Sequence, residues 1–170
     1  VVLDTKEPTF RHEAYPAYKA TRSPMPEELK AQIPLLQRFL DVWGVRTVSA
    51  PGFEADDVIG TLAVQADEAG VETYIVSRDK DLKQLLSARV RLFDFKTGET
   101  YGAEALKKDT GLEPAQFRDY LGIAGDTSDN IPGIPKLGPK KATELLKRYE
   151  SLDGVLSHWE DVAGLKGFGR

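Results

Sequence analysis

Residues 45–81, VRTVSAPGFEADDVIGTLAVQADEAGVETYIVSRDKD, are expected to form a strand, a helix and a second strand. Val45–Val48 is a short apolar strand, and the turn Ala50-Pro51-Gly52 follows it. The helix covers about residues 55–69, because apolar residues recur there with helical spacing. The second strand covers residues 71–76. A strand, a crossover helix and another strand predict two parallel strands of an α/β sheet.

The same alternation continues upstream. Val1–Leu3 is an apolar strand that ends at Asp4, and residues 27–43 form a helix in which Pro34 predicts a kink. Its apolar face consists of Leu29, Ile33, Leu36, Phe39 and Leu40. Residues 8–26 are interrupted by prolines and rich in Arg, Tyr and Lys, which predicts a mobile, arching element.

Downstream, we expect a helix at residues 81–86 and a strand at 90–95, with a hairpin turn at Thr97-Gly98. Residues 1–100 are therefore predicted to be an α/β core, a mainly parallel sheet flanked by helices on both faces. Residues 101–170 are predicted to be a helical extension of the same domain. Its helices are expected at residues 103–109, 114–123 and 139–149.

The composition excludes several classes of protein. The 170 residues include 23 Lys and Arg against 27 Asp and Glu, a formal charge of −4, and no cysteine. Disulfide frameworks, thiolate zinc sites and thiol nucleophiles are thus excluded, and His12 and His158 are too few for a histidine zinc site. No apolar run approaches the ~20 residues of a membrane span. A chain without cysteine suits a reducing cytoplasm.

Closely spaced acids occur at strand ends, helix starts and loops. They are Asp4, Glu54, Asp56, Asp57, Asp79, Asp81, Asp126 and Asp129. Each alone is explained as a helix cap or turn residue. However, the carboxyl ends of parallel strands open on one rim of a sheet, so the acids are expected to converge there. Like charges ~4 Å apart repel by ~1 kcal/mol in water and ~4 kcal/mol at an effective dielectric of 20. Oxygen-rich sites of this kind favour Mg²⁺ or Mn²⁺, and two such ions can hydrolyse phosphodiesters.

A basic turn forms the second signal. In residues 133–142, GIPKLGPKKA, Gly138 is expected to cap a helix and Pro139 to occupy its first position. The free N–H groups of such a helix start bind anionic oxygens. Basic residues surround the turn: Lys136, Lys140, Lys141, Lys147 and Arg148. This pattern predicts binding to a sugar-phosphate backbone, although a capped, solvated helix would also explain it.

Cations alternate with aromatic residues in FRHEAYPAYKATR, residues 10–22. Arg11, Lys19 and Arg22 suit phosphates, and the rings of Tyr15 and Tyr18 suit stacked bases, although an exposed basic helix would look similar. His12 has no visible partner that would make it a catalytic base.

In this order, FRHEAYPAYKATR, GFEADDVIG, SRDKDLKQLL and GDTSDNIPGIPKLGPKKA resemble the 5′-nuclease domain of bacterial DNA polymerase I, within the flap-endonuclease family. The resemblance covers essentially the whole chain. It implies a PIN-like core with a helix-hairpin-helix-type extension, and a two-metal nuclease that removes 5′ flaps and RNA primers. The implied first metal group is Asp4, Glu54, Asp56 and Asp57, and the second is Asp79, Asp81, Asp126 and Asp129.

The resemblance also implies roles for cations. Lys19 would polarise the scissile phosphate, with Tyr18 and Arg22 in the same arch; Gly133–Ala142 would hold the duplex and a K⁺ ion. The predicted DNA-binding residues are Arg11, Tyr18, Gly133, Lys136, Gly138, Lys140 and Lys141. Lys136 departs from the family, which usually has glycine there. The family also has an upstream strand with a metal-binding Asp, so we expect this sequence to be a piece of a larger protein.

The expected substrate is DNA with a 5′ flap or nick, or an RNA primer, bound by a cytoplasmic monomer that is tethered to a polymerase domain. A DNA-binding module with a degenerate acidic site is the main alternative. An RNA-cleaving relative would not need GIPKLGPKKA, and a phosphotransferase would need a P-loop that the sequence lacks.

Overall fold

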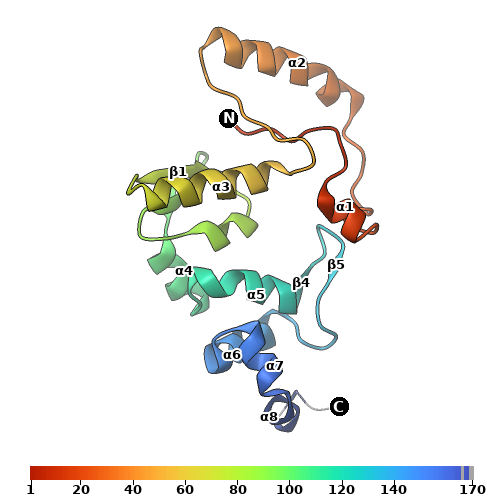
Figure 1. Cartoon of the computed structure of the whole chain (residues 1–170), viewed down its shortest axis with the longest axis vertical. Helices are drawn as coiled ribbons and strands as arrows, with labels where there is room; N and C mark the ends of the chain where they lie inside the picture. The colour runs from red at the N-terminus through yellow and green to blue at the C-terminus, as the bar shows by residue number, and fades with distance from the viewer. Residues whose placement is uncertain (166, 169–170) are drawn as a thin grey trace. The chain divides into compact units, whose positions relative to one another are not determined.

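The computed structural model describes residues 1–165 and 167–168, which form two compact units (Figure 1). The first unit contains residues 1–62 together with Ser128–Asn130. The second contains residues 63–127 and the chain from Ile131 onward. Helix α3, Ala55–Glu68, begins in the first unit and ends in the second.

The first unit contains one parallel bridge, between Val2 and Val48. The Leu3 N–H donates to the Val48 carbonyl over 3.0 Å, and the Val48 N–H donates to the Val1 carbonyl over 2.9 Å. The segments predicted as the strands Val1–Leu3 and Val45–Val48 thus share one parallel bridge, and the prediction of full strands is wrong. A single bridge leaves their other backbone groups outside a ladder.

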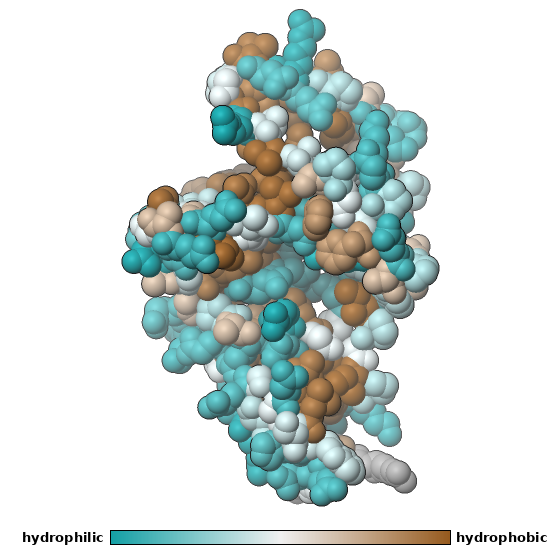
Figure 2. All heavy atoms as spheres, viewed as in Figure 1, coloured by the Kyte–Doolittle hydropathy of each residue, from teal (hydrophilic) through white to brown (hydrophobic). Residues whose placement is uncertain are grey.

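Besides the start of α3, this unit contains two helices: α1, Phe10–Ala14, and α2, Glu27–Val42. Helix α2 lies where a helix was predicted and continues through Pro34. Its chain turns at Gly44, whose φ is +68°. Only Leu40 of its apolar face is buried, and Phe39 is 50% exposed. Apolar patches are visible among polar ones in Figure 2.

The second unit is built on a three-stranded sheet. Strand β1, Thr73–Val76, pairs in parallel with β2, Val90–Asp94, and β2 pairs antiparallel with β3, Glu99–Tyr101. The predicted hairpin turn at Thr97-Gly98 is confirmed, with Gly98 at φ +73°. The predicted helix at 81–86 is instead a 3₁₀ helix, η1, Asp81–Leu85. At five residues it is longer than most 3₁₀ runs.

Helices complete the second unit. They are α4 (Ala103–Thr110), α5 (Pro114–Ala124), α6 (Pro139–Tyr149), α7 (Leu152–Ser157) and α8 (Trp159–Gly164). The first three confirm the predicted helices within one residue. The buried residues Leu112, Ile123, Ala142 and Leu146 form the core that joins α5 to α6. In the described part of the chain, no helix is long and apolar enough to cross a membrane.

A tight glycine contact holds the loop between α5 and α6. Strand β4, Gly125–Asp126, pairs antiparallel with β5, Ile131–Pro132. A β-carbon on Gly125 would lie 2.2 Å from the Gly133 nitrogen, and one on Gly133 would lie 2.3 Å from the Ala124 carbonyl oxygen. Both positions therefore require glycine, and the predicted DNA contact Gly133 has a structural role as well.

Candidate active site

Predicted acids lie at the start of α3 in the first unit: Asp4, Glu54, Asp56 and Asp57. The Asp4 Oδ1 accepts from the Ala55 N–H over 2.7 Å, and the Asp57 Oδ2 accepts from the Glu54 N–H over 2.9 Å. Both bonds satisfy N–H groups that a helix start leaves free. Asp4 and Asp57 thus cap this helix, whatever further role they have.

Arg11 neutralises one of these acids. Its Nη1 and Nη2 each donate to an Asp57 carboxylate oxygen over 2.7 Å. This bidentate contact lowers the pKa of Asp57 and raises the pKa of Arg11. Glu54 lies 3.6 Å from the same guanidinium. Arg11, predicted to bind DNA, is thus committed to carboxylates in this structure.

Tyr18, Lys19 and Arg22 surround the other acids of the group. The Lys19 Nζ lies 2.5 Å from Glu54 and 3.9 Å from Asp129, while Arg22 pairs with Asp129. The Tyr18 hydroxyl lies 2.8 Å from Glu54 and 3.0 Å from Asp129. Burial, followed by these two carboxylates, raises the Tyr18 pKa far above its usual value, so the phenol stays protonated.

The backbone of Lys19 lies in the left-handed region, with φ +55°. Its N–H donates to the Asp129 carbonyl over 2.9 Å. A side chain in this region costs ~1–2 kcal/mol, so the surrounding contacts must hold Lys19 in place. The resemblance assigns Asp129 to the second metal group, whereas the structure places it with Glu54 in the first unit.

A cavity of about 370 Å³ adjoins this group. Its lining includes Asp4, Glu54, Lys19, Arg22 and His12. Donor and acceptor side chains from α1, the following turns and the start of α3 thus face one volume.

The second unit holds the other acids. Asp79 follows β1, Asp81 begins η1 and Asp126 lies in β4. The Asp81 N–H donates to the Asp79 Oδ1 over 2.9 Å, and Lys80 pairs with Asp126 over 3.0 Å. The sheet-end position predicted for Asp79 is confirmed.

Asp81 is the acid whose environment most favours a bound cation. Burial, and then the charges of Asp126 and Asp79, raises its pKa to about 6. Its Oδ1 is buried and has no hydrogen-bond partner among the described residues. The carboxylates of Asp79, Asp81 and Asp126 lie close to one another, and Lys80 pairs with Asp126 beside them. Carboxylate oxygens of this kind fit a hard divalent cation.

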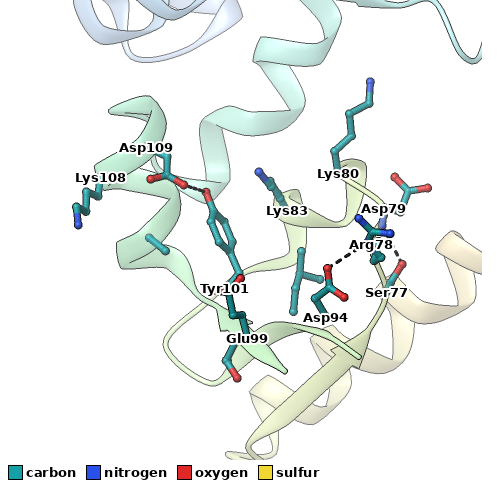
Figure 3. A pocket seen from close by; sticks show the side chains of 13 residues that line it. Ser77, Arg78, Asp79, Lys80, Lys83, Asp94, Glu99, Tyr101, Lys108 and Asp109 are labelled. Carbon is teal, nitrogen blue, oxygen red and sulfur yellow. Dashed lines mark hydrogen bonds and ion pairs between the residues drawn. The ribbon is translucent and has the colours of Figure 1, made fainter. Parts of the chain in front are cut away.

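An open pocket of about 640 Å³ lies beside this group (Figure 3). Arg78 pairs with Asp94 over 3.1 Å on one side, and the Tyr101 hydroxyl donates to Asp109 over 2.9 Å on the other. Asp79 lines the pocket with Lys80 and Lys83. Burial and the bond to Asp109 raise the pKa of Tyr101 to about 12.

Neither group has metal geometry in this structure. Among residues 1–165 and 167–168, no three acidic or histidine side chains are arranged as they would be around an ion. The chain's own cations hold the carboxylates instead, chiefly Arg11, Lys19, Arg22 and Lys80. Asp56 is exposed in the first turn of α3.

The basic turn precedes α6 as predicted. Gly138 is the N-cap residue and Pro139 the first helical residue. Lys136 has φ +68°, a conformation that favours glycine. Lys136 and Lys140 are exposed, so their ammonium groups are accessible to a phosphate backbone. Lys141 is only partly exposed, and its ammonium lies 5.2 Å from the centroid of the Phe168 ring.

The chain belongs to the 5′–3′ exonuclease family. Residues 1–111 match the model of the 5′–3′ exonuclease N-terminal, resolvase-like domain, and residues 112–167 match the model of its C-terminal SAM fold. This confirms the resemblance and the expected α/β core with a helical extension. The predicted boundary near residue 100 stays a prediction.

Individual relatives agree with this assignment. The chain is 44% identical over 162 residues to the thermostable DNA polymerase I of Thermus thermophilus, covering 95% of this chain and 19% of that protein. It is 41% identical to the 5′–3′ exonuclease of Aquifex aeolicus, covering 94% and 55%. The structure of the T5 5′-exonuclease with bound zinc matches with a TM-score of 0.72 and 26% identity, covering 92% and 62%. The chain thus spans about a fifth of the polymerase relative and about half of the exonuclease.

Sequence reasoning did not single out three residues of the site. Lys80 stands between two candidate acids, and that position was the signal for a neutralising cation. Asn130 donates to the Ala17 carbonyl over 2.7 Å, a long-range contact without a sequence signal. The third is Thr9, whose N–H donates to the His12 Nδ1 over 3.1 Å; His12 itself was singled out, but without a visible partner.

Proposed function

We propose that this chain is a structure-specific 5′ nuclease that hydrolyses phosphodiesters at 5′ flaps and primers in DNA. Asp81 carries the proposal. Its Oδ1 is buried without a hydrogen-bond partner in the part of the chain that the structure describes, and the pKa of its carboxyl is raised; both observations support a divalent cation at this place. The names of the relatives and the bound zinc of the T5 5′-exonuclease support it.

Two divalent cations, Mg²⁺ or Mn²⁺, would be held by the two carboxylate groups. When bound, such ions activate water and stabilise the leaving oxygen of a phosphodiester. Asp79, Asp81 and Asp126 would hold one ion, and Glu54, Asp57 and Asp129 the other, with Asp4 and Asp56 nearby in the chain. Lys19 and Arg22 would neutralise the substrate phosphate.

The turn at 133–142 would hold the sugar-phosphate backbone, through the exposed lysines and the free N–H groups at the start of α6. A K⁺ ion at this turn is part of the proposal. The proposal also includes an RNA primer as a substrate, a monomeric state and a cytoplasmic location. It further includes a tether to a polymerase domain, which the similarity to a DNA polymerase I supports.

Cleavage of a 5′-labelled flap duplex tests this function. We expect Mg²⁺-dependent release of the flap and loss of activity in EDTA. Asp81→Asn should lower the cleavage rate ~100-fold or more, because it removes several kcal/mol of stabilisation. The control is Asp41→Asn, an exposed acid of α2. Equal cleavage by both variants would reject the role of Asp81.

A second candidate is a DNA-binding module with a degenerate acidic site. The observation that favours it is the pairing of the acids with the chain's own cations, with no metal geometry among the described residues. Such a module would bind flap DNA equally well with and without divalent cations, and it would not cleave.

A further inference from the structure

We propose that His12 is a substrate-binding residue, which donates a hydrogen bond from Nε2 to a phosphate oxygen of the DNA strand. This inference rests on the proposed function and concerns the cavity beside the first carboxylate group. It assigns to the cavity a ligand of a defined class, the phosphodiester of a nucleotide strand.

The contacts of His12 define which of its two ring nitrogens carries the proton. The Thr9 backbone N–H donates to the His12 Nδ1 over 3.1 Å, and the Thr9 hydroxyl lies 3.0 Å from the same nitrogen. A backbone N–H can only donate, so Nδ1 must be the acceptor. The proton of the neutral ring therefore resides on Nε2, which becomes a hydrogen-bond donor.

The ring is also fixed in orientation. His12 packs edge-on against the Tyr18 ring, with centroids 5.3 Å apart and planes at 76°. Tyr18 is only 5% exposed and its hydroxyl contacts Glu54 and Asp129. Thr9 is 6% exposed. A donor held between two buried residues loses little further freedom when it binds a ligand.

Cations line the same cavity as His12. His12 lines the 370 Å³ volume with Lys19, Arg22 and Lys6. The acids on the same wall are Asp4, Glu7 and Glu54, of which Glu54 already binds Lys19 and Tyr18. An imidazole N–H, an ammonium and a guanidinium together suit the several acceptor oxygens of a phosphodiester.

Two substitutions separate binding from helix capping. Thr9 and His12 occupy the N-cap and N3 positions of a capping box, where Gln and Glu are the usual N3 residues. His12→Gln keeps an acceptor for the Thr9 N–H and also keeps a donor. His12→Glu keeps the acceptor but has no donor, and it adds a negative charge. Both variants should therefore fold, with thermal midpoints close to that of the unaltered chain.

Binding is measured by fluorescence anisotropy with a labelled single-stranded 12-mer in EDTA, so that no cleavage occurs. We expect His12→Gln to bind within ~2-fold of the unaltered chain and His12→Glu to bind ~10-fold more weakly or worse, a change of ~1.4 kcal/mol. Lys6→Gln is the charge control, because it changes the charge of the same cavity wall by one unit and retains His12. We expect it to weaken binding only ~2-fold.

A methylphosphonate 12-mer, whose backbone is uncharged but keeps one acceptor oxygen at each phosphorus, should remove the part of the difference between His12→Gln and His12→Glu that comes from charge and keep the part that comes from the hydrogen-bond donor. The proposal is overturned if the two variants bind ordinary DNA equally, or if Lys6→Gln weakens binding as much as His12→Glu does. Cleavage of the flap duplex by the unaltered chain is scored separately. A chain that binds through His12 but does not cleave would reject the nuclease function and leave this inference standing.

Discussion

Lys136 occupies a backbone conformation that its residue type disfavours. Its φ of +68° lies in the left-handed region, and its side chain is exposed. A residue with a β-carbon costs ~1–2 kcal/mol there, whereas glycine has no such cost but loses more entropy on folding. Lys136→Gly should therefore raise the free energy of unfolding by ~0.5–1 kcal/mol, measured by urea denaturation.

The matched control for that prediction is Lys140→Gly, four residues further on in the first turn of α6. A glycine within a helix lowers stability, here by ~0.5–1 kcal/mol. If both substitutions changed stability in the same direction, the left-handed conformation at Lys136 would not be the reason.

Asp81 predicts a pH dependence of stability. Its pKa in the folded chain is about 6, above its ordinary value of 3.8, so the folded chain binds its proton more tightly. The protonated carboxyl contributes to the free energy of unfolding. This contribution is complete below pH ~4 and is lost as the pH rises through ~6. The group is partly exposed, so solvent screening reduces the cost of its ionisation to ~1 kcal/mol.

Asp81→Asn, measured in EDTA, should thus be more stable than the unaltered chain at pH 7.5 by ~1 kcal/mol. Its free energy of unfolding should also change less between pH 4 and 6 than that of the unaltered chain. Urea denaturation across this range measures it. An unchanged pH profile would show that Asp81 is not crowded by Asp79 and Asp126.

At the scale of elements, the helices were the most predictable part of the fold. Periodic apolar residues and start signals such as Pro139 located α5 and α6 within one residue. The strands Val1–Leu3 and Val45–Val48 failed as full strands because a sequence pattern indicates strand propensity, whereas pairing depends on a partner. The sequence pattern of η1 predicted a helix but could not distinguish a 3₁₀ helix from an α-helix, because the segment has only five residues.

The turn before α6 is predicted to bind phosphates without reading bases. Lys140→Gln should weaken binding of duplex DNA to a similar extent for different sequences and reduce the salt slope of log K by ~1. Lys30→Gln, an exposed lysine of α2 that pairs with Glu27, is the control and should leave both unchanged. The measurement is fluorescence anisotropy at several salt concentrations. Sequence-dependent losses would contradict backbone recognition.

At the scale of the whole molecule, each compact unit contains one group of candidate carboxylates. The sequence predicted which acids lie at strand ends and helix starts, and Asp79 and Asp57 do so. It could not predict that Arg11, Lys19, Arg22 and Lys80 would pair with them, because several of these contacts join distant residues; Arg22 and Asp129 are 107 positions apart. Asp129 is grouped with Glu54 because of such contacts, with Tyr18 and Arg22.

Titration with Mn²⁺ by isothermal calorimetry tests the central claim, that the two acidic groups bind divalent cations. We predict two ions at millimolar affinity or tighter, with one lost in Asp81→Asn and the other in Glu54→Gln, while Asp41→Asn retains both. Failure to bind Mn²⁺, or binding that all three variants retain, would contradict the account.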